Sequence, residues 1–378
     1  MTRWKWLTAL AVLASGLAVA GPAGADGEPL VAALDVEYDH AHGVSYVVGV
    51  NESGEIDVYY GANRNWSKLA ENRDIDNRYS PDEFVGIAFG GEHPRFGVGV
   101  GTVVVDVNPL NGSNNVDLQP RCTSINAREF SDKAYFGDGR PTVIADTLAE
   151  CLDVEYDAAN DLYVLVGVNT SGEIDVYHGF HDDWTKLADN RDIGGRFAAD
   201  EFVDMALGAD PYAGIVVGNR IVDVNPLNGS ANVDLQQRCV YTNARSFSGK
   251  PWFGDYTPQV IDGLASCLAV EWDGDNDRFV IVGANPAGQI DVYYGTTENR
   301  GSFTKLQENR DLDNRFSPAE FVGFAFGGEA RYAGVAIGNE EDHKVAWRTY
   351  EPRATSVNIR EFSDKPWFGD GRPRAIAK

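Results

Sequence analysis

An aromatic residue followed closely by an arginine and an aspartate recurs three times along the chain. Together these residue types could bind a sugar, because an aromatic ring packs against the apolar face of a sugar while guanidinium and carboxylate groups hydrogen-bond its hydroxyls. The alternative is structural: arginine and aspartate pair with each other or with turn backbone, and the rings pack between sheets. The three sets are Trp66, Arg73 and Asp74; Trp184, Arg191 and Asp192; and Phe303, Arg310 and Asp311.

A second candidate site is an acidic turn in which Asp273, Asp275 and Asp277 alternate along the chain. Oxygen ligands at alternating positions suit a hard cation such as calcium. The turn departs from an EF-hand loop, since Arg278 and Ala284 replace the glycine and the glutamate of its sixth and twelfth positions. A solvated turn is therefore the alternative, and calcium is the one cofactor that the sequence raises.

Motifs of the common enzyme classes are missing. No HExxH, Gly-x-Ser-x-Gly or phosphate-binding loop occurs, and the histidines recur at no common repeat position. A glycosidase or lyase needs only two carboxylates that the fold brings together, and 57 acidic residues offer too many pairs to rank. The sequence therefore favours a binding module, with a carboxylate-based enzyme as the alternative and no catalytic residue nominated.

These candidates lie within a threefold internal repeat, whose copies span residues 30–146, 147–263 and 264–378. The copies open with the related strings LDVEYD, LDVEYD and LAVEWD, at Leu34, Leu152 and Leu268. A repeat of this length holds two supersecondary units and so decides the architecture.

Each copy alternates between apolar runs and turn residues. In the first half of copy one, four short runs separated by turn-forming residues predict an antiparallel meander, and the second half predicts another. Three copies of two meanders give six four-stranded sheets, so we predict an all-β fold, a six-bladed β-propeller. Three tandem β-sandwich or barrel domains are the alternative, although no linker rich in Pro, Ser or Thr separates the copies. The predicted strands cover 34–38, 46–50, 55–60, 66–69, 84–89, 96–100, 103–107 and 125–130.

The four cysteines follow the repeat. Cys122 and Cys239 share one repeat position and Cys151 and Cys267 share another, each of the latter just before the opening string of a copy. In an oxidising compartment we predict the disulfides Cys122–Cys151 and Cys239–Cys267, each joining the end of one copy to the start of the next. A third bridge would join Ala354 to Ala33, so its absence fits either a closed ring or an open row.

The N-terminal segment predicts export. Arg3 and Lys5 precede an apolar run over 7–20 and a small-x-small site ending at Ala25, so we expect residues 1–25 to be a cleaved signal peptide and 26–378 to form the mature propeller. The run is shorter than the about 20 residues of a membrane helix. The formal net charge is −25, which disfavours nucleic acid and anionic membranes as partners.

Taken together, these features predict a secreted, lectin-like binding module with repeated sites, whose partner is an extracellular glycan or protein. Repeated weak sites gain avidity on a multivalent surface. The copies also differ: Gly194 and Gly195 replace an Asp-Asn pair, Asp204 replaces a glycine, and copy three has a shorter segment with His343 and Trp347. We therefore do not expect the sites to be equivalent.

Overall fold

The structure of the chain is a computed structural model that describes most of the strands and the tight turns between them. The predicted signal peptide lies outside the described residues. These residues are 29–40, 43–62, 65–69, 75, 78–90, 97–107, 117–129, 134–136, 141–180, 183–187, 193–208, 214–225, 234–247, 250–253, 258–296, 303–306, 312, 315–327, 334–340, 352–362, 365–368 and 374–376.

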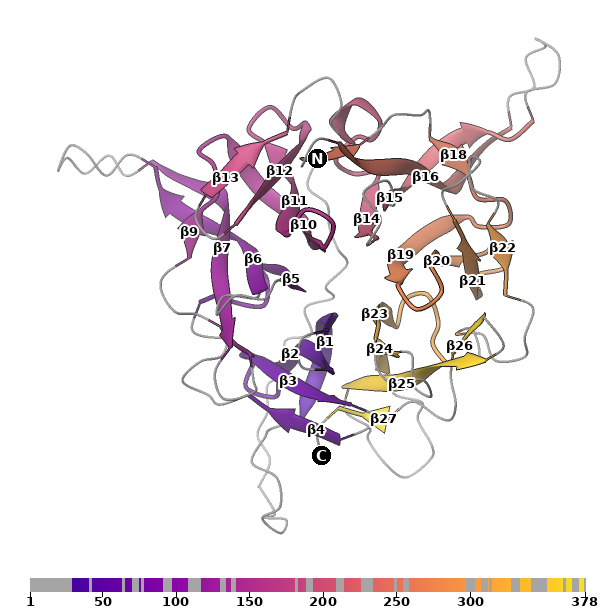
Figure 1. Cartoon of the computed structure of the whole chain (residues 1–378), viewed down its shortest axis with the longest axis horizontal. Coiled ribbons are helices and arrows are strands. Elements are labelled where there is room, and N and C mark those ends of the chain that lie inside the picture. Colours follow the sequence, from indigo (N-terminus) through magenta and orange to yellow (C-terminus); the bar gives the residue numbers. More distant parts are fainter. Residues whose placement is uncertain are drawn as a thin grey trace.

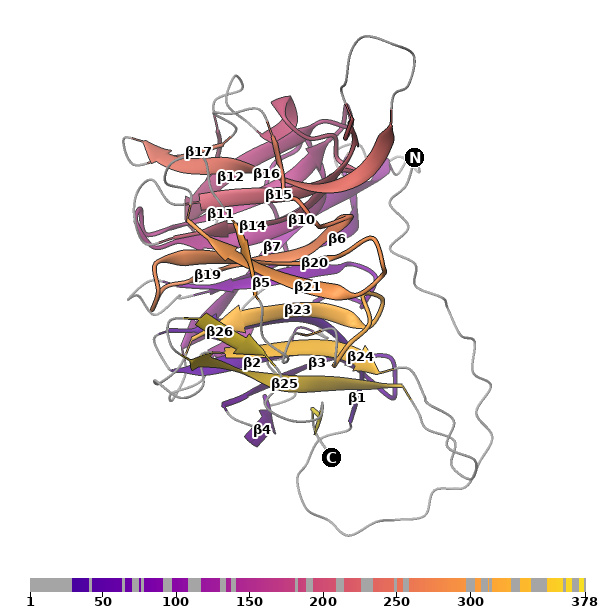
Figure 2. The same ribbon diagram turned by 90° about the vertical axis from the view of Figure 1, so that its right-hand side faces the viewer.

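Six antiparallel sheets stand around a central axis as the blades of a propeller (Figure 1). The first strand of each blade lies nearest the axis, and the next strands follow outward. Seen from the side, the strands run across the thickness of the ring, roughly along its axis (Figure 2). The predicted six-bladed β-propeller is thus confirmed, and the alternative of three tandem domains is wrong.

The odd-numbered blades are four-stranded meanders. Blade 1 comprises β1 (Leu30–Asp39), β2 (Val44–Asn51), β3 (Ile56–Ala62) and β4 (Asn65–Lys68). Blade 3 comprises β10 (Leu148–Asp157), β11 (Leu162–Asn169), β12 (Ile174–Phe180) and β13 (Asp183–Lys186). Blade 5 comprises β19 (Ser266–Asp273), β20 (Arg278–Ala284), β21 (Ile290–Gly295) and β22 (Thr304–Lys305).

The even-numbered blades carry a short fifth strand, which the sequence did not predict and which pairs with the third strand beside the fourth. Blade 2 comprises β5 (Phe84–Phe89), β6 (Gly97–Asp106), β7 (Leu118–Glu129), β8 (Ala134–Phe136) and β9 (Thr142–Val143). Blade 4 comprises β14 (Phe202–Leu207), β15 (Gly214–Asp223), β16 (Leu235–Phe247), β17 (Lys250–Phe253) and β18 (Gln259–Val260). Blade 6 comprises β23 (Phe321–Phe326), β24 (Gly334–Glu340), β25 (Arg353–Phe362), β26 (Lys365–Phe368) and β27 (Arg374–Ala375).

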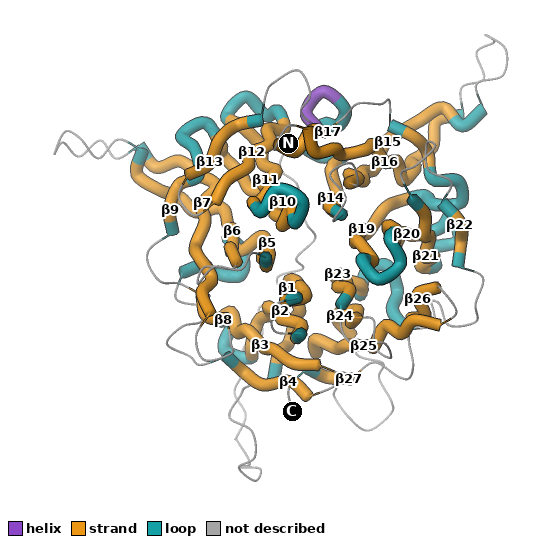
Figure 3. Tube along the Cα trace, in the orientation of Figure 1, coloured by secondary structure: helices purple, strands orange, loops and turns teal. Residues whose placement is uncertain are grey.

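Strands and turns account for almost all of the described chain (Figure 3). Helical geometry among the described residues is limited to the 3-10 turn η5 (Ile193–Gly195), which contains the Gly-Gly pair peculiar to copy two, and to Ile75 and Leu312 at the same repeat position in the other copies. Nowhere in the described part of the chain does a helix have the length and apolar character needed to cross a membrane.

The hairpin between the second and third strands shows how local sequence fixes the blades. In blade 1, the Asn51 side-chain oxygen accepts hydrogen bonds from the backbone N–H groups of Ser53 and Glu55 at 2.9 and 3.0 Å. Gly54 has a φ of 83°, which favours glycine. The Asn and Gly recur in blades 3 and 5 at Asn169 with Gly172 and at Asn285 with Gly288, with the same bonds.

Apolar side chains fill the space between each pair of neighbouring blades. Three of the six clusters lie between the two blades of one copy. The other three lie at the junctions between copies: blade 2 with blade 3, blade 4 with blade 5, and blade 6 with blade 1. The core is therefore a ring of inter-blade layers, and it continues across the seam where the chain begins and ends.

Both predicted disulfides are confirmed, and each crosses a junction between copies. Cys122 on β7 is bonded to Cys151 on β10, and Cys239 on β16 to Cys267 on β19. At the third junction Ala33 and Ala354 are buried in one apolar cluster. There the Asn339 side-chain oxygen accepts a hydrogen bond from the backbone N–H of Ala33 at 2.7 Å. The chain is therefore a closed ring whose seam lacks a disulfide.

Candidate functional site

The innermost strands enclose a cavity of about 390 Å³ on the propeller axis. The side chains that line it include six carboxylates, and none of the described lining residues is basic. Five of the six belong to the strings that open the copies, and the sixth, Asp204, lies on β14. The acidic residues of the lining are Asp35, Glu37, Asp153, Glu155, Asp204 and Glu271.

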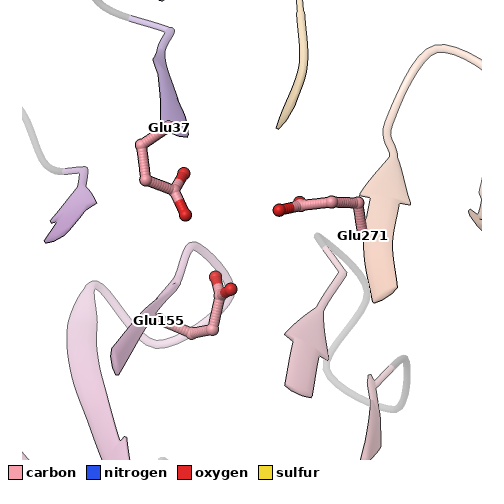
Figure 4. Close-up of side chains that lie close together, drawn as sticks. All are labelled: Glu37, Glu155 and Glu271. Atoms are coloured by element: carbon pink, nitrogen blue, oxygen red, sulfur yellow. The ribbon is translucent and has the colours of Figure 1, made fainter. Parts of the chain in front are cut away.

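Three glutamates, one from each copy, meet at this axis. Glu37, Glu155 and Glu271 are the fourth residues of the opening strings and extend from β1, β10 and β19 toward one another (Figure 4). One carboxylate oxygen from each lies within 4.8 Å of those from the other two. Each strand has a register irregularity shortly before its glutamate, and such bulges re-aim side chains. The threefold repeat therefore builds a threefold carboxylate cluster.

The aspartates of the cavity have a different role, because backbone N–H groups occupy both of their oxygens. Asp153 accepts from Val154 on its own strand at 2.8 Å and from Met205 on the next blade at 3.0 Å. Asp204 accepts from Met205 at 2.9 Å and from Val270 on the following blade at 2.8 Å. Asp35 makes the equivalent pair of bonds from blade 1 to blade 2. These aspartates tie neighbouring inner strands together.

Fewer donors reach the glutamates. Glu37 accepts a hydrogen bond from the backbone N–H of Tyr38. For Glu155 and Glu271, no hydrogen-bond or ion-pair partner exists among the described residues, and both interact only with like charges. Each of the three glutamates is partly buried, and each lines the cavity.

Burial in this acidic environment opposes ionisation. Desolvation raises the pKa of Glu37, Glu155 and Glu271 well above the ordinary glutamate value, and repulsion from the neighbouring carboxylates raises each pKa further. Burial, followed by the adjacent Asp153, likewise raises the pKa of Asp204. The cavity thus holds excess carboxylates that lack compensating positive charge.

The aromatic residues predicted as ligand contacts lie at the three junctions between copies. Trp66 packs against the cluster between blades 6 and 1, Trp184 against that between blades 2 and 3, and Phe303 against that between blades 4 and 5. All three remain partly exposed. The indole N–H groups of Trp66 and Trp184 are buried, with no hydrogen-bond partner among the described residues.

The junction between blades 4 and 5 differs from the other two. The Phe303 ring packs edge-on against Tyr241, with ring centroids 4.9 Å apart. The residue at the repeat position of Tyr241 is Ser124 in copy one and Ser356 in copy three. A phenylalanine and a tyrosine therefore stand where the other junctions have a tryptophan and a serine.

The charged residues predicted to complete these pockets lie outside the described residues, so their placement beside the aromatic rings stays a prediction. This applies to Arg73, Asp74, Arg191, Asp192, Arg310 and Asp311, and also to His343 and Trp347 of the shortened segment in copy three.

Each copy contains the string Lys-Leu-x-x-Asn-Arg-Asp, and its lysine has a structural role near the aromatic residues. Lys68, at the end of β4, forms an ion pair with buried Asp57 on β3 at 2.8 Å, and the Asn51 side chain donates to the same carboxylate. The corresponding pairs in the other copies are Lys186 with Asp175 and Lys305 with Asp291. The lysines therefore fasten the fourth strand to the third.

The acidic turn predicted as a calcium loop joins β19 to β20. Asp273 is buried and accepts from the Arg278 guanidinium at 3.0 Å and from the Asn276 side chain, whereas Asp275 and Asp277 are exposed. Within the described part of the chain these three aspartates do not form a carboxylate cluster. Asp273 therefore pairs with Arg278 and does not form a site with Asp275 and Asp277.

Sequence reasoning missed the cavity glutamates. The signal was present: the glutamate is kept in all three opening strings, while the aspartate two residues earlier becomes Ala269 in copy three. Copy two adds Asp204 to the same cavity, which explains in structural terms a difference between the copies that the sequence showed.

Comparison with known proteins supports the fold. No family model matches the sequence, and no characterised protein is similar in sequence. Among solved structures, the chain is similar to the SapL1 lectin in complex with alpha methyl fucoside, with a TM-score of 0.51 and 10% identity over 90% of this chain and 96% of that one. It is also similar to the fucose-specific lectin from Aleuria aurantia, with a TM-score of 0.51 and 10% identity over 93% and 98%. The ring of this chain is therefore similar in fold to these two proteins over nearly its whole length.

Proposed function

We propose that the protein is a secreted binding module that recognises carbohydrate at the three junctions between copies. The observation that carries this proposal is the repeated, partly exposed aromatic side chain at those junctions, with an unpartnered indole N–H at two of them. We expect a neutral sugar, because the strongly negative chain repels anionic ligands.

The chemistry of these residues matches a sugar ring. The partly exposed aromatic face offers apolar contact, and a small movement of the ring on binding would bring the buried indole N–H within reach of a hydroxyl. A buried donor left without an acceptor costs about 1–3 kcal/mol, so a hydroxyl that accepts from it removes this cost on binding. The arginine and aspartate that follow each aromatic residue in sequence would supply the remaining polar contacts.

The two similar structures support a glycan as the ligand class, since one is described as a fucose-specific lectin and the other is in complex with alpha methyl fucoside. Threefold repetition also favours recognition of a multivalent glycan surface. Differences between the junctions predict unequal affinities, with Phe303 forming the odd site.

The test is glycan-array binding followed by calorimetry with methyl fucoside and the best array ligands. We expect two or three sugars per chain. The double variant W66F/W184F keeps the aromatic faces but removes both N–H donors, as in the natural third copy. It should weaken two of the sites by about 5- to 150-fold, corresponding to about 1–3 kcal/mol.

Trp272 provides the matched control, because its indole N–H is also buried without a partner but belongs to the inner strand β19. W272F should leave sugar binding unchanged. Unchanged stoichiometry in a folded W66A/W184A/F303A variant would reject the junction sites. Turnover of an oligosaccharide at a single site would instead favour a carbohydrate-active enzyme, and the absence of any sugar binding would favour a protein partner.

A further inference from the structure

We propose that Glu37, Glu155 and Glu271 bind one divalent cation of calcium size on the propeller axis. The site is separate from the acidic turn at Asp273 and from the sugar sites at the junctions. It is built by all three copies, so no single copy contains it.

The spacing of the oxygens fits such an ion. Three atoms no more than 4.8 Å apart all lie within about 2.8 Å of the centre of the circle that encloses them, close to calcium–oxygen distances of about 2.3–2.6 Å. Magnesium requires about 2.0–2.1 Å and nearly ideal octahedral geometry, so it fits less well. Calcium takes about six to eight oxygen ligands, and water in the 390 Å³ cavity can supply those that the carboxylates do not.

Two of the three ligands have no other partner. Glu155 and Glu271 are partly buried and extend into the cavity without a hydrogen-bond donor among the described residues. The aspartates around them show that this strand geometry can satisfy a carboxylate fully with backbone N–H groups. Buried charges are ordinarily paired or bound to a metal, so the unsatisfied glutamates are the groups that a cation would complete.

The charge of the cavity favours the same ligand. Its described lining contains six carboxylates and no basic residue. The three glutamate carboxylates meet at the axis, where they repel one another, and a divalent cation between them would relieve this repulsion.

A cation at this position would also link the three copies. Two of the three junctions already have a disulfide, whereas the junction between blades 6 and 1 does not. Glu37 belongs to blade 1, so the ion would hold the first copy to the other two at the axis. Its loss should therefore destabilise the whole ring.

The experiment uses the full-length protein, treated with EDTA and then titrated with Ca²⁺ alone in the absence of sugar. We expect calorimetry to give one ion per chain, and a hundredfold excess of Ca²⁺ over Kd to raise Tm by about 3–4 °C. Mg²⁺ should bind at least tenfold more weakly.

Two variants locate the ion. E155Q/E271Q should lose at least tenfold in Ca²⁺ affinity while remaining folded, because it removes buried like charges. D275N/D277N, which alters the acidic turn, should bind Ca²⁺ as the parent does. The proposal is wrong if Ca²⁺ neither binds nor raises Tm, or if E155Q/E271Q responds like the parent. If only D275N/D277N loses Ca²⁺ binding, the ion binds at the acidic turn and the proposed axial site is wrong. Sugar binding is measured separately on the ion-free protein, so the cation proposal and the sugar-binding proposal can each fail independently.

Discussion

Ala33 and Ala354 occupy, at the seam between blades 6 and 1, the positions that hold cysteines at the other two junctions. The backbone around them is the same. Asn339 accepts a hydrogen bond from the Ala33 N–H at 2.7 Å, as Asn219 does from the Cys267 N–H at 2.7 Å. The carbonyl oxygen of Ala354 accepts from the Ile376 N–H at 3.0 Å, and that of Cys239 from Ile261 at 3.0 Å. We therefore expect A33C/A354C to form a third disulfide.

The magnitude follows from the length of chain that the bridge would close. The native bridges join residues 29 and 28 positions apart, which corresponds to about 3.6 kcal/mol each in the chain-entropy estimate. Ala33 and Ala354 are 321 positions apart, which gives about 5.7 kcal/mol as an upper value. With an unfolding entropy of about 2.1 cal/mol/K for each residue of the ring, Tm should rise by at most about 8 °C.

The assay is differential scanning calorimetry of A33C/A354C, oxidised and reduced, with peptide mapping under non-reducing conditions. The single variants A33C and A354C control for the added sulfur atoms. If the mapped bridge joins any other pair of cysteines, or if the oxidised protein unfolds at the same temperature as the reduced one, then the seam is not equivalent to the other junctions. The reasoning from repeat symmetry would then be refuted.

Two further predictions concern packing and charge. G90A should destabilise the protein by about 1–3 kcal/mol in urea unfolding, because an added Cβ would lie 1.9 Å from the Tyr156 ring. G195A, where nothing lies within 4 Å, should change stability by less than about 0.5 kcal/mol; equal effects would contradict the packing argument. In EDTA, Glu155 should make stability depend on pH because its pKa is raised in the folded state. Its contribution to the free energy of unfolding is fully present below the unfolded-state pKa and is lost as pH rises through the folded-state pKa. E155Q should show a smaller decline than the parent, because only Glu37, Asp204 and Glu271 still contribute to it, and should be more stable than the parent at pH 7 but not at pH 4. Parallel pH profiles of the two proteins would contradict this prediction.

Much of the architecture could be predicted because it depends on local patterns that occur in all three copies. The hairpin at Asn51 and Gly54 needs only an asparagine side chain that accepts hydrogen bonds from turn N–H groups and a glycine that adopts a positive φ. The disulfides followed from where Cys122 and Cys151 fall relative to the copy boundary. The short strand β9 was missed because a two-residue strand has no periodicity, and its pairing with β7 depends on where the chain crosses to the next blade.

The cavity could not be predicted because its contacts join residues from different copies. Alternation places Asp35 and Glu37 on one face of a strand, and nothing local shows that backbone donors reach Asp35 while Glu155 and Glu271 have none. That distinction arises only when three inner strands meet at one axis. The unpartnered indole of Trp66 is likewise a property of the closed ring, since the apolar cluster beside it includes residues of blade 6.

The seam has a consequence for modularity. In the described part of the chain every sheet takes its strands from one continuous stretch, and no strand crosses from the last blade into the first. Leu30 of the first blade and Ile376, close to the last strand, are instead buried in the same apolar cluster at the seam. The covalent chain is therefore not what closes the ring. In a circular permutant opened at either of the other junctions, the new termini would pack against each other in the same way. The two-blade copy is therefore the unit in which this propeller could be permuted or extended.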